Sequence, residues 1–273
     1  MSDQFKAQGL AVYPTEGVAV HALGQYLSHA ELLEAVKARN PPLPVPPRSV
    51  GSSSLLDEAT SLALLAERGV QVARHQLCGS EDAVHAAFIA LGGTQVVVKG
   101  CTAHASHKSE LGLVHLGVQD SATAVSAYRA ISQAAAAAEV PLSGVIVAEL
   151  VRGRRELMIG ARLDPVLGAV LLVGDGGKYV EAMPDAQVML APFDEAKVER
   201  ALRQLRMAPL LDGVRGEPPL DVASFCQMAV AVGQLMCDDA AGITQLDINP
   251  VIVGAKGQGC VAVDAVVYRE DKH

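Results

Sequence analysis

The sequence predicts a mixed α/β (α+β) protein whose main part has two lobes, each with a sheet flanked by helices. In the first half of the chain, helical patterns alternate with short apolar runs that are typical of buried strands. In the second half, three strand-like segments follow one another closely at residues 144–151, 155–164 and 168–177. Short loops favour antiparallel neighbours, so we expect a largely antiparallel sheet in the second lobe.

The composition of the chain limits the classes of protein to which it can belong. Half of the 273 residues are hydrophobic, which is enough for a sizeable core. The formal net charge is −8, and lysines and arginines are scattered singly, so the basic stripe of a nucleic-acid-binding surface is missing. No apolar run reaches the roughly 20 residues that span a bilayer. The five cysteines are widely spaced, as is typical of free thiols in a reducing compartment. We therefore expect a cytoplasmic protein that binds neither nucleic acid nor membrane.

A proline-rich segment, Asn40–Arg48, divides the chain. Proline fixes φ and removes a backbone donor, so residues 41–51 are predicted to form a semi-rigid linker. Residues 1–40 contain an extended segment, Gly9–Tyr13, and a helical pattern from Glu16 to Lys37. So short a piece buries little surface, and we expect it to be the tail of a fold whose remainder lies elsewhere.

The first lobe is predicted to begin with a helix from Ser52 to Gly69, capped by Ser54 and ended by its glycine. Ser80 is a candidate N-cap for a second helix. The further elements predicted in this lobe are a strand at 70–73, a helix at 81–91, a buried strand at 94–100 and a helix at 122–138.

The second lobe is predicted to continue, after its three strands, with helices at 194–207 and 222–237. Two closing strands at 243–253 and 259–267 are expected to form a hairpin with Ala255–Gln258 at its turn.

Lys99 ends the apolar run VVVK. A lysine that leaves a buried strand can place its ammonium group against a phosphate in a cleft. The simpler alternative is a lysine at a strand end whose ammonium reaches water.

Three histidines, His104, His107 and His115, fall within a dozen residues. They fit a metal site poorly because no cysteine or carboxylate pattern accompanies them. Two further interpretations are open. The histidines are exposed loop residues, or one of them is a nucleophile, since imidazole can carry a phosphoryl group. Lys108 and Ser109 could then neutralise and hydrogen-bond that group. Spacing alone does not choose among these interpretations.

Polar residues interrupt the closing strands. Asp247 and Asn249 are two apart on one strand, so they face the same side, and Asp264 is expected in the middle of the next strand. If the strands pair, Asn249 and Asp264 converge as oxygen ligands of the kind that suits Mg²⁺.

The glycines of GDGG, residues 174–177, can bring backbone N–H groups close to an anion, although such a run can equally be a simple turn.

Eight motifs in this order resemble the ATP-grasp domain of the NDP-forming acyl-CoA synthetases, relatives of the succinyl-CoA synthetase β subunit. They are LDEATSLALLAERGV, VVVKG, SHKSELG, VAELV, RELMIGARLDPVLGAVLLVGDGG, LDGVRG, LDINP and VAVDA. The resemblance implies an ATP-grasp domain at 52–270, with a first lobe at 52–143, a second lobe at 144–270 and nucleotide in the cleft between them. The N-terminal GLAVYPTEGVAVHALGQYL resembles the tail of the CoA-ligase domain that precedes ATP-grasp in fused family members.

The resemblance also implies roles for the matching residues. Lys99 would contact the nucleotide phosphates, with Glu156 nearby, and His107 would accept the phosphoryl group and carry it between sites. A hinge for adenine and ribose would be formed by Glu149, Leu150 and Val151. A loop beside the phosphates would be formed by Gly174, Gly176 and Gly177, and Mg²⁺ would be bound by Asn249 and Asp264.

The reaction that the resemblance implies is acyl-CoA + ADP + phosphate ⇌ acid + CoA + ATP. In the family a second phosphohistidine lies on the acyl-CoA-forming portion, which this chain lacks. The resemblance therefore implies a partner, either a CoA-binding α subunit or upstream domains. The sequence does not identify the acid, whose recognition is expected to lie in that partner.

Two positions depart from the family pattern. Leu111-Gly112-Leu113 replaces a pair of glycines, and Asp175 stands where an apolar residue is usual. A bulkier and more acidic loop would hinder the approach of phosphate. Two other functions therefore stay open: a non-catalytic nucleotide-binding regulatory or assembly module, and an ATP-grasp carboxylate–amine ligase that uses no histidine relay.

Overall fold

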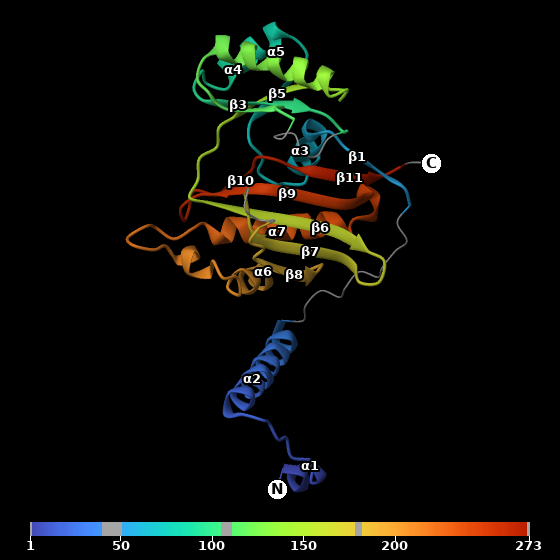
Figure 1. The fold of residues 1–273 in the computed structure, drawn as a ribbon, viewed down its shortest axis with the longest axis vertical. Coiled ribbons are helices and arrows are strands. Elements are labelled where there is room, and N and C mark those ends of the chain that lie inside the picture. The colour runs from blue at the N-terminus through green and yellow to red at the C-terminus, as the bar shows by residue number, and fades with distance from the viewer. Residues whose placement is uncertain (1, 40–50, 105–110, 178–181, 272–273) are drawn as a thin grey trace. The chain divides into compact units, whose positions relative to one another are not determined.

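The computed structural model describes residues 2–39, 51–104, 111–177 and 182–271. The chain divides into two compact units, residues 1–42 and 43–273 (Figure 1). The predicted linker at 41–51 lies, apart from Gly51, outside the described residues.

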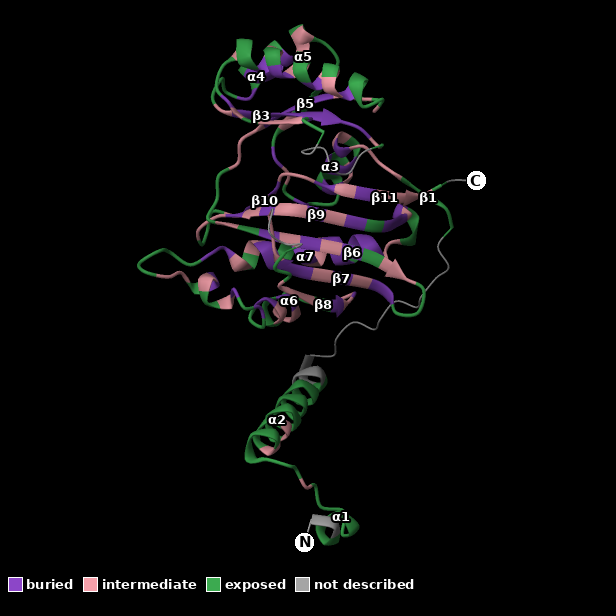
Figure 2. Ribbon diagram, in the orientation of Figure 1, coloured by how far each residue is buried: buried purple, intermediate pink, exposed green. Residues whose placement is uncertain are grey.

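The N-terminal unit contains helix α1, Ser2–Ala7, and helix α2, Glu16–Arg39. The latter confirms the helix predicted from Glu16. Residues 9–13 form no strand, contrary to the prediction, because the described part of this unit offers no second strand for pairing. Within the part of the unit whose side chains are described, none is buried, and Figure 2 shows α2 exposed along nearly its whole length.

The described part of the second unit contains a seven-stranded and a four-stranded sheet, both antiparallel. The larger sheet has the order β1–β11–β9–β6–β7–β8, with β10 paired to β9. Its strands are β1 (Ser53–Leu55), β6 (Arg155–Asp164), β7 (Gly168–Asp175), β8 (Ala186–Leu190), β9 (Ile243–Val253), β10 (Cys260–Ala262) and β11 (Val266–Glu270).

One face of the larger sheet is covered by helices α6, Glu195–Leu202, and α7, Val222–Cys237 (Figure 1). Asp221 caps α7, and apolar residues at helical spacing, among them Phe225, Ala229 and Val232, face the core. Short 3₁₀ helices, η1 (Ala208–Asp212) and η2 (Asp239–Ala241), follow α6 and α7.

The four-stranded sheet has the order β2–β5–β3–β4, with bounds His75–Cys78, Gly144–Glu149, Val96–Cys101 and Val114–Val118. Helices α4, Glu81–Ala90, and α5, Ser121–Ala137, pack on it and enclose a second apolar core. Ser80 caps α4, as predicted, and its side chain accepts a hydrogen bond from the N–H of Ala83.

Helix α3, Glu58–Glu67, lies between the two sheets (Figure 1). Its Leu62 and Leu65 belong to the core of the larger sheet, whereas Ala59 packs against a small cluster on the smaller sheet. The lobes therefore do not divide at residue 143. The strand β5 belongs to the smaller sheet, and β1 pairs with β11 of the larger one, because hydrogen-bond partners rather than chain order decide which sheet a strand joins.

Three predicted elements are corrected in detail. Residues 53–55 form a strand, and the first helix begins later, with Asp57 rather than Ser54 as its N-cap; the Asp57 carboxylate accepts a 2.8 Å hydrogen bond from the Thr60 N–H. The strand expected at 70–73 is only a bridge from Val72 to Ala262, and pairing begins at β2. The helix expected at 194–207 ends at Leu202 and is followed by η1.

The predicted hairpin is confirmed as the pairing of β9 with β10. Its second strand is interrupted, however, because β10 ends at Ala262 and β11 starts at Val266. Asp264 therefore lies in the break between two strands, not in the middle of one.

Candidate functional site

A cleft of about 1290 Å³ lies between the two sheets. Residues of β3, β4 and β5 line it from one side, and residues of β6, β7 and β9 line it from the other. The predicted site residues that line this cleft are Lys99, Glu149, Leu150, Val151, Glu156, Gly177, Asn249 and Asp264. Gly174 and Gly176 are not among the lining residues, and His107 lies outside the described residues.

Lys99 is carried by β3, the central strand that pairs with both β4 and β5. It is only 6% exposed. Its ammonium group donates to the Glu58 carboxylate and, over 2.8 Å, to the carbonyl of Val263. Burial disfavours the charged form, but the carboxylates of Asp264 and Glu58 outweigh it and hold the pKa of Lys99 above its ordinary value. The cleft therefore presents a fixed positive charge at this point.

Glu58 was not predicted from the sequence as part of the site. It occupies the first turn of α3 and is 2% exposed. A buried carboxylate is costly unless it is paired, and its ion pair with Lys99 joins α3 to the smaller sheet. In the sequence, Glu58 is a glutamate next to an apolar helical stripe. Such a glutamate normally indicates a favourable charge at a helix N-terminus and not a buried ion pair.

Side-chain oxygen atoms of the larger sheet and of the β10–β11 connection gather near Lys99. Asp247 and Asn249 lie two apart on β9, and Asp264 follows β10. Both Asp247 and Asp264 line the cleft, and burial and then the neighbouring Asp264 carboxylate raise the pKa of Asp247 above its ordinary value. A divalent cation would relieve that repulsion.

The donor set of Asn249 and Asp264 fits Mg²⁺. Both are oxygen ligands in one cleft, and Mg²⁺ is commonly held by one or two protein groups plus substrate phosphates. The amide oxygen of Asn249 accepts a 2.8 Å hydrogen bond from the Gly177 N–H, which uses one of its two lone pairs. Among the described residues, no group of three or more His, Cys, Asp or Glu could hold a metal ion by itself.

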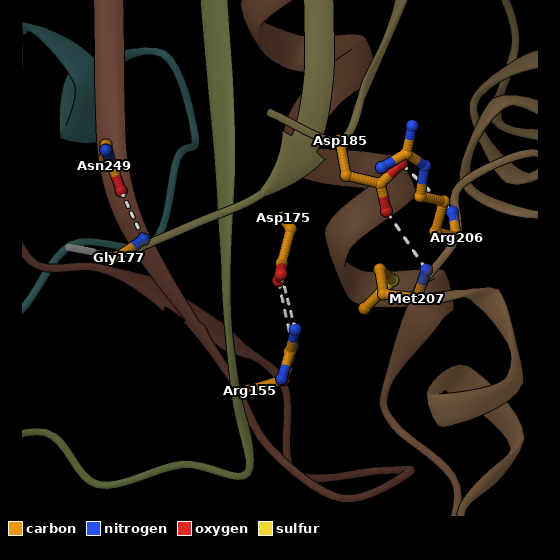
Figure 3. A network of polar contacts seen from close by, with 7 residues as sticks. All are labelled: Arg155, Asp175, Gly177, Asp185, Arg206, Met207 and Asn249. Carbon is orange, nitrogen blue, oxygen red and sulfur yellow. Dashed lines mark hydrogen bonds and ion pairs between the residues drawn. The ribbon is translucent and has the colours of Figure 1, made fainter. Parts of the chain in front are cut away.

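The glycine-rich segment is shaped by close backbone approach. A Cβ on Gly174 would lie 2.5 Å from the carbonyl oxygen of Asp185, and one on Gly176 would lie 2.5 Å from that of Leu157. Only Gly177, with φ of +81°, reaches the cleft among the three predicted glycines, and Figure 3 shows it facing Asn249.

Asp175, one of the departures from the family pattern, does not line the cleft. Its carboxylate is bound by the guanidinium of Arg155 through two hydrogen bonds of 3.0 and 2.5 Å (Figure 3). Asp185, just before β8, accepts hydrogen bonds from the backbone N–H groups of Arg206 and Met207. The acidic charge of Asp175 is therefore compensated by a neighbouring strand.

The second departure is also explained by packing. Leu113 is fully buried in the core between the smaller sheet and its helices, and its carbonyl accepts from the Gly100 N–H. Gly112 keeps a positive φ of +68°. Leucine at 113 thus fills the core of this lobe.

The hinge residues connect β5 to the larger sheet. The Glu149 carboxylate accepts from the backbone N–H of Arg74 at 2.9 Å and from its Nε at 2.8 Å. The Leu150 N–H donates to the carbonyl of Gln95. Glu149 therefore uses its side chain within the protein, and Leu150 and Val151 present an apolar surface to the cleft.

Taken together, the cleft holds a fixed ammonium group beside a cluster of oxygen ligands, and apolar side chains line it at the hinge. Such an arrangement can bind a polyanion with its counter-cation and hold a flat apolar ring beside them.

Comparison with known proteins gives matches over the same region. The ATP-grasp domain family matches residues 49–268. A trans-feruloyl-CoA synthase from an unknown prokaryotic organism is 31% identical over 271 residues, which are 98% of this chain and 38% of that protein. The β subunit of the ADP-forming acetate–CoA ligase I of Pyrococcus furiosus is 30% identical over 237 residues, which are 86% of this chain and 95% of that protein.

The solved structures of the dinucleotide forming acetyl-coenzyme A synthetase 1 of Ca. Korarchaeum cryptofilum are also similar. The complex with coenzyme A and Ca-AMPCP has a TM-score of 0.74 at 26% identity and covers 88% of this chain and 99% of that one. In another structure of that protein, with coenzyme A and Mg-AMPPCP, a phosphohistidine segment points towards the nucleotide-binding site.

Helices in the described part of the present chain are all too short or too polar to cross a membrane. The chain spans well under half the length of the trans-feruloyl-CoA synthase.

Proposed function

Because the chain belongs to the ATP-grasp family that includes the β subunits of ADP-forming acetate–CoA ligases, we propose that it is the nucleotide-binding, phosphoryl-transferring part of an ADP-forming acyl-CoA synthetase. The net reaction is acyl-CoA + ADP + phosphate ⇌ acid + CoA + ATP. The single observation that carries the proposal is that Lys99 of the smaller sheet, Asn249 of the larger sheet and Asp264, between β10 and β11, line one cleft.

Each group has a distinct task in this proposal. The Lys99 ammonium binds the phosphates of ATP, and the Gly177 N–H helps to fix the Asn249 oxygen beside them. Asn249 and Asp264 hold Mg²⁺, which when bound neutralises negative charge on the phosphates. The base lies against the apolar hinge at Leu150 and Val151, and Glu156 borders the phosphate end.

His107 is the proposed phosphoryl acceptor. One imidazole nitrogen forms a bond to the γ-phosphorus while the bond between that phosphorus and the departing oxygen of ADP breaks. On a CoA-binding α subunit or on upstream domains, the phosphoryl group passes to the acid to give an acyl phosphate. The CoA thiol then displaces phosphate from it and forms acyl-CoA. The five cysteines are free thiols, which supports a reducing, cytoplasmic location.

The test is phosphorylation with ATP labelled on the γ-phosphate, in the presence of Mg²⁺ and of the CoA-binding partner. Phosphohistidine is recognised because it is labile in acid and stable in alkali. We expect His107→Ala to abolish this label, chelation of Mg²⁺ to suppress it, and the controls His104→Ala and His115→Ala to keep it. Label that persists in His107→Ala would refute the relay.

The same experiment separates the two alternatives. ATP binding without any phosphoenzyme, even with the partner present, would indicate a regulatory or assembly module. Release of ADP that depends on an amine acceptor instead of CoA would indicate a carboxylate–amine ligase.

A further inference from the structure

Among the residues that the structure describes, Glu58 is the most deeply buried charged group that the proposed mechanism leaves without a task. Its side chain is fully enclosed, and the side chain of its partner Lys99 is 8% exposed. Breaking such a pair leaves an uncompensated charge in the interior, so the two side chains hold each other in place. The pair thus sits at the wall of the cleft, with the lysine facing the opening.

Helix α3 gives this carboxylate a rigid support. Leu62 and Leu65 anchor the helix in the core of the larger sheet, and Ala59 contacts Cys101, Ile146 and Ala148 of the smaller sheet. Asp57 caps the turn that carries Glu58. The carboxylate is therefore presented to Lys99 from an element that packs on both lobes.

The ammonium of Lys99 has three N–H donors. One is directed to Glu58 and another to the carbonyl of Val263, so one remains for a ligand. Asp264, next in the chain to Val263, is close enough to act on Lys99 electrostatically. Lys99 thus stands between two carboxylates, one on α3 and one that the proposed function assigns to Mg²⁺.

We propose that Glu58 is a positioning residue: it holds the ammonium of Lys99 at the phosphate end of the cleft and limits how strongly it interacts with Asp264. The inference rests on the proposed function, because it assumes that phosphates bind at Lys99. A flexible lysine side chain that is fixed before the ligand arrives has less freedom to lose on binding.

The test compares Glu58→Gln, Lys99→Met and the double variant with the wild-type chain. Calorimetry gives the Kd of ATP with and without Mg²⁺, and the labelling assay gives the rate of phosphohistidine formation. For Glu58→Gln we expect ATP binding in Mg²⁺ to weaken about 10-fold and phosphoryl transfer to slow by about 100-fold, as misplacement by about 1 Å can do. The Mg²⁺ concentration needed for half-maximal ATP binding should rise, because Lys99 without Glu58 competes more strongly with the cation for Asp264.

Glu81→Gln is the matched control. It removes the same charge from an ion pair of 2.6 Å with Arg129, on the surface of the smaller lobe and away from the cleft lining. We expect it to change neither the ATP affinity nor the Mg²⁺ dependence. In the Lys99→Met background, Glu58→Gln should add no further loss, since Glu58 acts through Lys99.

The outcomes are separable. Wild-type protein that binds no ATP would refute the proposed function itself. Wild-type binding with an unchanged affinity, rate and Mg²⁺ dependence in Glu58→Gln would refute only the positioning role. If Glu58→Gln alone fails to fold, the double variant, which removes both members of the ion pair, is compared with Lys99→Met; equal ATP binding supports the inference, and a further loss overturns it.

Discussion

At the residue scale, the segment Gly174–Gly177 shows why a sequence motif and its structural cause can differ. The motif predicted three glycines beside phosphate, yet the structure places only Gly177 in the cleft among them. Gly174 and Gly176 are needed because β8 and β6 pass too close for a side chain. The spacing of glycines was visible in the sequence, but which strand approaches each one was not.

Gly176→Ala should therefore be strongly destabilising. Its Cβ would lie 2.5 Å from the backbone of Leu157, and the loop would have to move away from β6. We expect a loss of about 2 kcal/mol in the free energy of unfolding, as for overpacked sites. ATP binding should weaken as well, because the same segment holds the Gly177 N–H against Asn249. Urea denaturation and calorimetry measure the two effects.

The control is Gly79→Ala, at a glycine where a Cβ meets nothing within 4 Å and φ is not positive. This change should be neutral, or stabilising by about 0.5 kcal/mol through a less flexible unfolded chain. Equal stability losses in the two variants would show that close approach is not the reason for Gly176.

The residues of the site likewise divide into those that the sequence could predict and those that depend on the tertiary structure. Lys99, Asn249 and Asp264 could be predicted because each is a polar residue in an apolar strand pattern, which is costly without a partner. Glu58 could not, because glutamate in a first helical turn is commonplace and its burial depends on two sheets that meet there. The neutralisation of Asp175 by Arg155 likewise depends on the register of β6 against β7.

At the scale of elements, Asp221 joins helix α7 to the β9–β10 hairpin. It caps the helix through the Ser224 N–H, and its second carboxylate oxygen accepts from Gly257 at 2.9 Å and Gly259 at 2.8 Å. Burial raises the pKa of this carboxyl, but the N–H donors outweigh burial and hold the pKa below its ordinary value. The hairpin that follows the Asn249 strand is thus fixed to the helix beneath the sheet.

Asp221→Asn should cost about 2 kcal/mol at pH 7, because an amide nitrogen replaces the oxygen that accepts two N–H groups. A lowered pKa means that the carboxylate stabilises the fold fully above its ordinary value of 3.8, and that this stabilisation disappears as the pH falls through the lower folded value. The difference between variant and wild type should therefore shrink in acid below that value. Urea denaturation at a series of pH values measures it.

Asp120→Asn provides the comparison. Asp120 also caps a helix, but its carboxylate binds the N–H and the hydroxyl of Thr123 in that same helix, and asparagine caps about as well as aspartate. A loss at Asp120 as large as that at Asp221 would contradict the special role of the hairpin contacts.

At the scale of the whole molecule, the apolar cores lie entirely within residues 43–273. The N-terminal unit exposes large apolar side chains, among them Val20, Leu23 and Tyr26. An exposed apolar surface of this kind is unusual in an isolated domain and typical of a surface that is covered by another one. The expectation that residues 1–40 are the tail of another domain stays a prediction.

Removal of residues 1–42 should leave the second unit intact. We expect the free energy of unfolding to change by less than about 0.5 kcal/mol and the Kd of ATP to stay the same, because no residue of the cores or of the cleft lining is lost. Thermal unfolding, calorimetry and size-exclusion chromatography check this. A shortened chain that aggregates, or melts at a much lower temperature, would show that the N-terminal unit contributes to the fold.

The sequence by itself determined the identity of most helices and strands, the pairing of the final hairpin and three polar residues of the cleft, Lys99, Asn249 and Asp264, because these depend on local periodicity, caps and isolated polar groups. Only the tertiary structure decided that β5 belongs to the smaller sheet, that Asp264 lies in a break between strands, and that Glu58 is buried against Lys99. The physical reason is that each of these depends on a hydrogen-bond or ion-pair partner far away in the chain, and periodicity within a segment carries no information about that partner.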